Sequence, residues 1–183
     1  MTATLINIAV FLITTLFSMY MTAILLRFLF QWVKADFYNP ICQFLIKVTN
    51  PLLIPFRRII PGWFGLDIAS LVLLFIVQLL ELGLLTLLFG TPFNSWVLLI
   101  AVLKLLQLVL NTYFFAVLLR AITSWFAASQ YHPGVILLQQ LTEPILRPAR
   151  RLIPPIAGID LSPVAVLIVL QILSMLLQSW VYV

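Results

Sequence analysis

Charged side chains are scarce in this sequence. They make up 8% of the 183 residues, whereas hydrophobic residues make up 64%, and the mean hydropathy is +1.20. So few charges cannot cover a water-facing surface, while a bilayer requires only spans of about 20 apolar residues. The composition therefore excludes an ordinary soluble protein and predicts a polytopic membrane protein.

Residues that perform catalysis or bind metals are also scarce. Cys42 is the single cysteine, which excludes an internal disulfide and a Cys-rich metal cluster, and a free cysteine is more often buried than reactive. His132 is the single histidine, and the sequence has neither a carboxylate cluster nor a Gly-rich phosphate loop. We therefore expect a protein that is not an enzyme, with no catalytic residues, no metal site and no cofactor.

A tandem repeat is the main feature that the sequence does contain. Shifted by 93 residues, the chain aligns with itself without a gap, and both residues 51–61 and residues 144–154 read Pro-x-x-x-Pro-x-Arg-Arg-x-Ile-Pro. Other identities at this offset are Tyr20 with Tyr113, Arg27 with Arg120, Trp32 with Trp125, Tyr38 with Tyr131, Pro40 with Pro133 and Asp67 with Asp160. The chain is a duplication with repeats at 1–90 and 91–183.

Each repeat predicts two membrane spans joined by a polar, proline-rich connection. The spans are expected at about 5–34, 67–89, 95–127 and 160–182. Because each copy crosses twice, both copies have the same orientation, as in parallel repeats. We expect an all-α membrane protein with four transmembrane helices. The first span should be retained rather than cleaved as a signal peptide, because no basic residue precedes it.

The basic residues predict how the chain is oriented. The connections within the repeats contain Lys34, Lys47, Arg57, Arg58, Arg147, Arg150 and Arg151, whereas the two termini and the turn at 90–94 contain none. Short basic loops stay in the cytoplasm, so we expect cytoplasmic connections and both termini outside. Arg27 and Arg120 lie near the inner ends of their spans, where snorkelling to the interface is expected.

Each connection predicts a short amphipathic helix in the cytoplasmic interface, at about 40–50 and 133–143. A polar cap and a proline begin each helix, and Pro51 and Pro144 are expected to end it. The apolar stripes are Ile41, Phe44, Leu45 and Val48 in the first copy and Gly134, Leu137, Leu138 and Leu141 in the second. The residues expected to face water are Lys47, Asn50, Gln140 and Glu143.

The paired arginines are candidate contacts for anionic head groups or for an acidic segment of a partner. Prolines stiffen the backbone around them, and a basic residue near an anionic leaflet contributes about 1 kcal/mol. The candidate contact residues are Lys47, Arg57, Arg58, Arg147, Arg150 and Arg151. Alternatively, the arginines only enforce topology and pair with Asp67 and Asp160. These aspartates follow Gly65 and Gly158, where each is expected to cap the next span.

Two intramembrane charges break the repeat, because Glu81 aligns with Ser174 and Lys104 with Phe11. Both lie at the same distance from the turn between the second and third spans, which predicts an ion pair at one depth. Gln78 and Gln107 are spaced in the same way and predict a flanking contact. The polar cluster is either a structural clamp between helices or part of a polar path.

The doubled Pro-x-x-x-Pro-x-Arg-Arg-x-Ile-Pro motif with Gly-x-Asp resembles the YggT family of bacterial inner-membrane proteins over nearly the whole chain. The resemblance implies the fold more strongly than an activity. Bacterial relatives are linked to osmotic-shock tolerance, ion uptake or cell-division genes, and plastid relatives to cytochrome assembly or nucleoid organisation. The family has no active site whose residues could be transferred to this chain.

Two functional classes follow. One is a non-enzymatic membrane protein of osmotic-stress tolerance that binds or organises lipid or a partner, including an assembly or division scaffold. The other is an oligomeric channel or transporter whose polar path contains Thr14, Ser18, Gln78, Glu81, Lys104, Gln107 and Asn111. We expect anionic lipid as a partner, keep a homo-oligomer or an unidentified membrane protein open, and expect no direct contact with nucleic acid.

Overall fold

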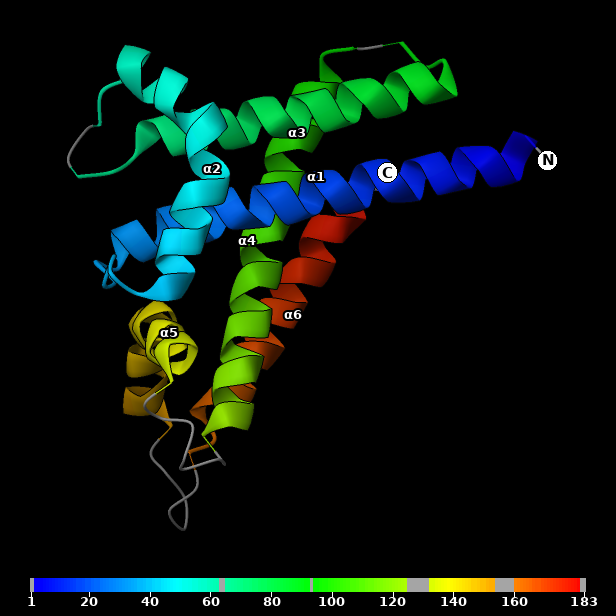
Figure 1. Ribbon diagram of the computed structural model, residues 1–183. Coiled ribbons are helices and arrows are strands. Elements are labelled where there is room, and N and C mark those ends of the chain that lie inside the picture. Colours follow the sequence, from blue (N-terminus) through cyan, green and yellow to red (C-terminus); the bar gives the residue numbers. More distant parts are fainter. Residues whose placement is uncertain (1, 63–64, 93, 125–131, 154–159, 182–183) are drawn as a thin grey trace. The chain divides into compact units, whose positions relative to one another are not determined.

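A computed structural model describes residues 2–62, 65–92, 94–124, 132–153 and 160–181, and its regular elements are helices. They are labelled in Figure 1: α1 (Thr2–Trp32), α2 (Pro40–Ile59), α3 (Ile68–Phe89), α4 (Trp96–Thr123), α5 (Pro133–Leu152) and α6 (Ser162–Val181). Of the residues used in the sequence analysis, Trp125, Tyr131, Pro154 and Gly158 lie outside the described part of the chain.

Four helices are long and apolar enough to cross a bilayer. The spanning segments are Ala3–Trp32, Ile68–Phe89, Trp96–Thr123 and Ser162–Trp180, which agrees with the four predicted spans. Polar caps define the ends of α3. Asp67 accepts a hydrogen bond from the Ser70 amide at its start, and Gly90 closes it in the left-handed conformation with a φ of 65°. The all-α, four-span fold expected from the sequence is therefore present.

The amphipathic helices are longer than predicted. Each continues through two prolines, at positions 51 and 55 in α2 and at positions 144 and 148 in α5, and ends only after the arginine pair. The prediction that the first proline ends each helix was wrong. Prolines four residues apart lie on one helix face, and all four are exposed, so the lost amide bonds are on the side away from the packed core. The arginine pairs thus belong to a helical last turn rather than to a loop.

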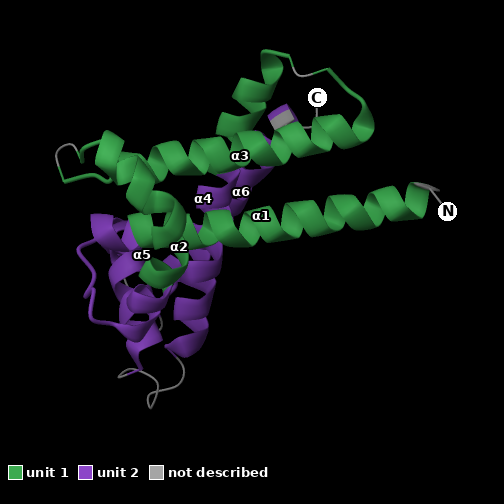
Figure 2. Cartoon of the chain, turned by 45° about the horizontal axis from the view of Figure 1, so that its top comes forward, with its two compact units in different colours: residues 1–28, 45–106 green, residues 29–44, 107–183 purple. Residues whose placement is uncertain are grey.

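The chain forms two compact units that do not coincide with the sequence repeats. One contains residues 1–28 and 45–106 and the other residues 29–44 and 107–183 (Figure 2). The second unit therefore includes a segment of the first repeat. Within it, Asn39 Nδ2 donates to the Pro133 carbonyl at 2.9 Å, and a Cβ at Gly134 would lie 3.2 Å from Ile41 Cδ1. In the same unit α5 packs against α6.

Candidate functional site

The site in the first repeat is centred on Arg27, near the end of α1. Its side chain is buried, and its Nη1 donates to Thr49 Oγ1 at 2.5 Å, to Asn50 Oδ1 at 2.9 Å and to the Ile46 carbonyl at 3.5 Å. All three acceptors lie on one turn of α2. Arg27 therefore ties α1 to α2, a role that the expectation of snorkelling to the interface did not include.

The second repeat contains the same arrangement around Arg120, near the end of α4. Its Nη1 donates to Thr142 Oγ1 at 2.7 Å and to the Gln139 carbonyl at 3.2 Å, and its Nη2 donates to Glu143 Oε2 at 2.8 Å. Each acceptor lies 93 residues after its counterpart in the first repeat. Asn50 and Glu143, which were predicted to face water, both contact the arginine of the preceding span, and the Glu143 side chain is also 44% exposed.

A second arginine in each repeat pairs with the aspartate that precedes the next span. Arg57 donates to Asp67, and Arg150 Nε donates to Asp160 Oδ2 at 2.9 Å. Asp67 and Asp160 also accept from Ser70 and Ser162, respectively, at the starts of α3 and α6. The aspartates therefore cap these helices, as predicted, and each also pairs with the first member of the arginine pair in its repeat.

These contacts shift the pKa values of the acidic groups. Burial acts to raise the pKa of Asp67 and that of Asp160, but the hydrogen bonds from serine and arginine outweigh it and hold both pKa values below their usual range. The hydrogen bond from Arg120 is the main cause of the lowered pKa of Glu143. All three carboxylates are therefore ionised near neutral pH.

One position makes the two networks chemically different. Glu143 bridges Arg120 and Arg150, because Arg150 Nη1 lies 3.2 Å from Glu143 Oε1. The first repeat has the neutral Asn50 at this place. The second network thus has two arginines and two carboxylates, whereas the position of Glu143 is held by a neutral amide in the network of Arg27, Arg57 and Asp67.

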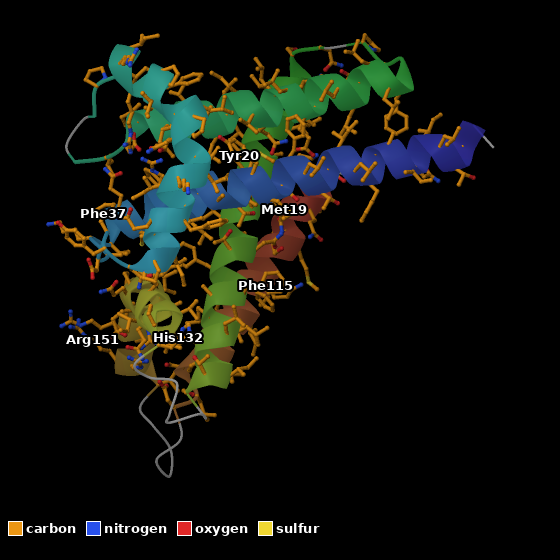
Figure 3. All side chains as sticks on the ribbon, viewed as in Figure 1. Met19, Tyr20, Phe37, Phe115, His132 and Arg151 are labelled. Atoms are coloured by element: carbon orange, nitrogen blue, oxygen red, sulfur yellow. The ribbon has the colours of Figure 1, made fainter. Side chains whose placement is uncertain are left out.

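The other predicted basic contacts remain on the outside of the helices. Within the described residues they have neither a hydrogen bond nor an ion pair, and they are Lys47, Arg58, Arg147 and Arg151. Figure 3 shows Arg151 at the surface of α5. Each arginine pair is therefore divided between a first member that contacts an aspartate and a second member that is exposed. Cys42 is buried, and burial raises the pKa of its thiol.

The intramembrane charges meet within the first compact unit. Lys104 Nζ lies 3.4 Å from Glu81 Oε1, and Gln78 Nε2 donates to Glu81 Oε2 at 2.7 Å. The Glu81 side chain is 6% exposed and that of Lys104 is 29% exposed. An unpaired charge in a span costs about 2.5–3.5 kcal/mol on insertion scales, so these contacts offset a large part of the cost of placing Glu81 there.

Gln78 and Gln107 each form side-chain hydrogen bonds within their own compact unit. Gln78 donates to Glu81, whereas Gln107 donates to Ser174 and, at 3.0 Å, to Asn111. Ser174 is the counterpart of Glu81 in the second repeat. The flanking contact between Gln78 and Gln107 stays a prediction.

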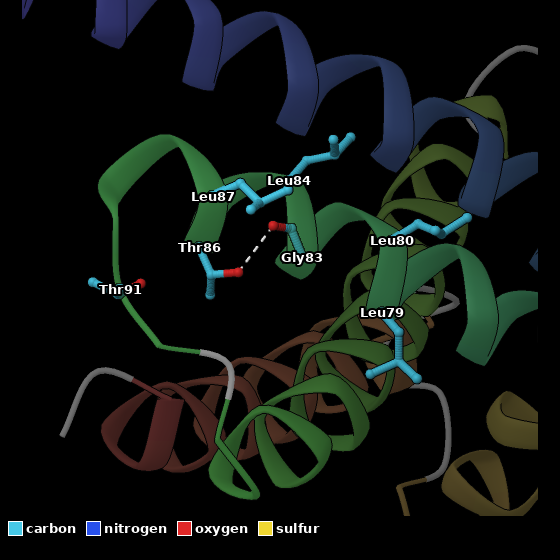
Figure 4. Close-up of a pocket in the computed structure, with 7 residues that line it drawn as sticks. All are labelled: Leu79, Leu80, Gly83, Leu84, Thr86, Leu87 and Thr91. Atoms are coloured by element: carbon cyan, nitrogen blue, oxygen red, sulfur yellow. Dashed lines mark hydrogen bonds between the residues drawn. The ribbon is translucent and has the colours of Figure 1, made fainter.

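A cavity of about 400 Å³ lies beside the second half of α3 (Figure 4). It is lined mainly by apolar residues: Leu79, Leu80, Gly83, Leu84, Thr86, Leu87 and Thr91. The Thr86 hydroxyl donates within its own helix, to the Gly83 carbonyl at 2.9 Å. Neither Glu81 nor Lys104 lines the cavity, so the cavity adds no polar surface to their ion pair.

Two threonines have a role that was not predicted from the sequence. Thr49 and Thr142 are fully buried, and each accepts from the arginine of the preceding span. They lie 93 residues apart and were identical in the alignment of the repeats. A repeated intramembrane arginine and a repeated threonine on the following amphipathic helix were the available signal.

The fold and the site define a class of protein, a multi-pass membrane protein of two tandem repeats, each with an arginine that ties its first span to an amphipathic helix. The chain belongs to the CCB3/YggT family, whose sequence profile matches residues 6–88 and again residues 99–181. The two matches begin 93 residues apart, which is the offset of the internal repeat. The resemblance drawn from the sequence motif is thereby confirmed.

Three relatives illustrate the range of similarity. An uncharacterized protein of Pseudomonas aeruginosa is 42% identical over 171 residues, covering 92% of this chain and 87% of that protein. The uncharacterized protein YggT of Escherichia coli is 36% identical over 169 residues, covering 92% and 88%, respectively. An uncharacterized protein of Guillardia theta, ycf19, is 31% identical over 71 residues, covering 38% of this chain and 78% of that protein. No solved structure matches the chain.

Proposed function

We propose that this protein is a non-enzymatic organiser of anionic lipid at the membrane interface. The observation that carries the proposal is the division of the arginine pairs. Arg57 and Arg150 contact aspartates, whereas Arg58 and Arg151 are exposed in the last turns of α2 and α5. Guanidinium groups bind phosphate with planar, bidentate geometry, which suits them to lipid head groups.

The shape of α2 supports contact with a lipid surface. An exposed apolar stripe runs along it, and the adjacent stripe contains Lys47 and Arg58. The stripe residues are Ile41, Phe44, Val48, Leu52 and Ile59. An interfacial helix of this kind binds through buried apolar area together with attraction to anionic lipid, at about 1 kcal/mol for each basic residue.

The proposed cellular role is osmotic-stress tolerance in the bacterial inner membrane. The basic helices would lie on the cytoplasmic side and both termini outside, in keeping with the positive-inside rule. A change in lipid packing under osmotic load acts directly on interfacial helices. The resemblance to relatives linked with osmotic shock supports this role, and a homo-oligomer or a membrane-protein partner would use the same surface.

The test compares two variants of the exposed cations of α2 and α5 that have no ion pair within the described residues, namely Lys47, Arg58, Arg147 and Arg151, which are called the exposed cations below. The first replaces Lys47, Arg58, Arg147 and Arg151 by glutamine, and the control replaces only the three arginines by lysine, which keeps the charge. Lipids that co-purify with the full-length protein are quantified by mass spectrometry. We expect phosphatidylglycerol enrichment to be lost in the glutamine variant and largely kept in the lysine control. Unchanged enrichment in the glutamine variant would refute lipid organisation by this surface.

The second candidate is an oligomeric channel or transporter, favoured by the buried Glu81 and its partner Lys104. Flux of ions and solutes from proteoliposomes under an osmotic step tests it against protein-free vesicles. A conducting role predicts flux that disappears in Glu81→Ala and persists in the glutamine variant of the exposed cations. If the well-folded reconstituted protein gives no more flux than protein-free vesicles, the channel or transporter function is refuted.

A further inference from the structure

The first repeat has a buried arginine that lacks the carboxylate its counterpart has. Arg27 is 6% exposed, and its acceptors Thr49, Asn50 and the Ile46 carbonyl are all neutral. Arg27 lies in the field of both Arg57 and Asp67. Asp67 already pairs with Arg57, and a buried arginine without a carboxylate of its own is costly in a partly desolvated place.

Arg27 also has hydrogen-bond donors that its contacts with α2 do not use. Its hydrogen bonds in the described part of the chain use Nη1 only. In the second repeat, Nη2 of Arg120 donates to Glu143 at 2.8 Å. The donor that binds a carboxylate in one repeat thus has no acceptor in the other. The Asn50 amide accepts from Arg27 through its oxygen, which leaves its NH₂ group available for an anion.

We propose that a phosphate group, as a lipid head group or a free anion, binds between Arg27, Asn50 and Arg57 and takes the place that the Glu143 carboxylate occupies in the second repeat. The proposal rests on the proposed function, because it assigns anionic lipid to a defined site. It adds a site that is distinct from the exposed cations.

Charge balance supports one anion at this site. Arg120 and Arg150 against Glu143 and Asp160 give a net charge of zero, whereas Arg27 and Arg57 against Asp67 give +1. A phosphodiester has a single negative charge and restores the balance found in the second repeat. Arg27 lies five residues before the end of α1, or about 7.5 Å along the axis, which is compatible with the head-group level.

Two of the three residues of the proposed site are accessible from outside the protein. Asn50 is half-buried and the Arg57 side chain is 38% exposed, whereas Arg27 is 6% exposed. Charge-assisted hydrogen bonds from two guanidinium groups make a contact with phosphate strong.

The test exchanges the deciding residue between the repeats in the full-length protein. Asn50→Glu supplies the missing carboxylate, and Asn50→Gln is the matched control that keeps the amide. Glu143→Gln removes the corresponding carboxylate from the second repeat and should thereby create an equivalent phosphate site there. Native mass spectrometry counts retained lipids, and thermal unfolding in detergent is followed with phosphatidylglycerol or inorganic phosphate added.

We expect the wild type and Asn50→Gln to retain one phosphatidylglycerol and to gain about 2–4 °C in Tm from it. Asn50→Glu should lose this lipid and be more stable than the wild type in lipid-free detergent. Glu143→Gln should retain a second lipid. Stabilisation by inorganic phosphate alone would identify a free anion as the ligand, and stabilisation by lipid alone would identify the head group.

Equal lipid retention and equal Tm gains in wild type and Asn50→Glu would overturn the proposal. If Asn50→Glu does not fold, Glu143→Gln decides, because a folded Glu143→Gln protein without a second lipid contradicts the site. A failure of the proposed lipid-organising function gives a different result from a failure of this site. It appears as unchanged phosphatidylglycerol enrichment in the glutamine variant of the exposed cations, whose side chains form no hydrogen bond with Arg27.

Discussion

The two arginine networks share their framework and differ in their electrostatics. In both repeats an arginine from a span donates to a threonine and a backbone carbonyl of the following helix. The next residue is Asn50 in one network and Glu143 in the other. The neutral acceptors of the tie are common to both networks, whereas the single position beside the threonine supplies a carboxylate in one network and a neutral amide in the other.

The largest expected effect comes from removing the aspartate caps, and it should differ between the repeats. Asp67→Ala should lower the free energy of unfolding by about 2–3 kcal/mol, because a buried cap and ion pair are lost together. Asp160 is 38% exposed, so Asp160→Ala should cost only about 1 kcal/mol. Denaturation by SDS, monitored by far-ultraviolet circular dichroism, measures both. Equal losses would mean that burial does not distinguish the networks.

The next largest effect on the free energy of unfolding is expected at Glu81, in comparison with the equivalent position Ser174. Glu81→Ala should cost about 2–3 kcal/mol because Lys104 is left without its carboxylate in a span. Ser174→Ala should cost about 1 kcal/mol or less, the usual range for a neutral interhelical hydrogen bond. The double variant Glu81→Gln/Lys104→Gln should recover most of the loss caused by either single glutamine change. Failure to recover would argue against a structural clamp.

Acid should destabilise the protein, and more strongly through the second network. Asp67, Asp160 and Glu143 have lowered pKa values in the folded state, so the folded protein binds fewer protons than the unfolded chain. Their contribution is present above the unfolded pKa values and is lost as the pH falls through the folded ones. Tm should therefore decline below about pH 5. Glu143→Gln should show a shallower decline, and an identical profile would contradict the role of the bridge.

The smallest effect on stability is expected for the exposed arginines. Arg58→Gln and Arg151→Gln should each change the free energy of unfolding by less than about 0.5 kcal/mol, because neither has an ion pair within the described residues. The same detergent assay measures this, with Arg150→Gln as the comparison that should lose more. A large loss in Arg58→Gln would show that the paired arginines are not divided as described.

The spans could be predicted closely from the sequence. Four apolar runs longer than a bilayer requires leave few alternatives, and the observed helices begin and end within a few residues of the predicted bounds. The Glu81–Lys104 contact was also accessible, because a short turn places positions equally distant from it at similar depth. These features depend on length and periodicity, which a single sequence displays directly.

The ends of the amphipathic helices and the orientation of their polar residues could not be predicted in the same way. Pro51 and Pro144 normally disfavour a continuing helix, yet here the surrounding packing supports it. Asn50 and Glu143 were assigned to water because polar residues usually face it. An arginine on another helix binds each of these side chains, although Glu143 remains 44% exposed, and the position of that arginine depends on tertiary packing.

The interleaving of the compact units has a consequence for how such a chain can be divided. Residues 29–44 come from the first repeat but pack with the second, through Asn39 and Ile41 among others. Cutting the gene at the repeat boundary would separate this segment from its neighbours, and each half would have to recover them from another molecule. Because the two repeats are fused in one chain, the contact between them is intramolecular and does not depend on protein concentration. The fusion also fixes the ratio of the two repeats at one to one.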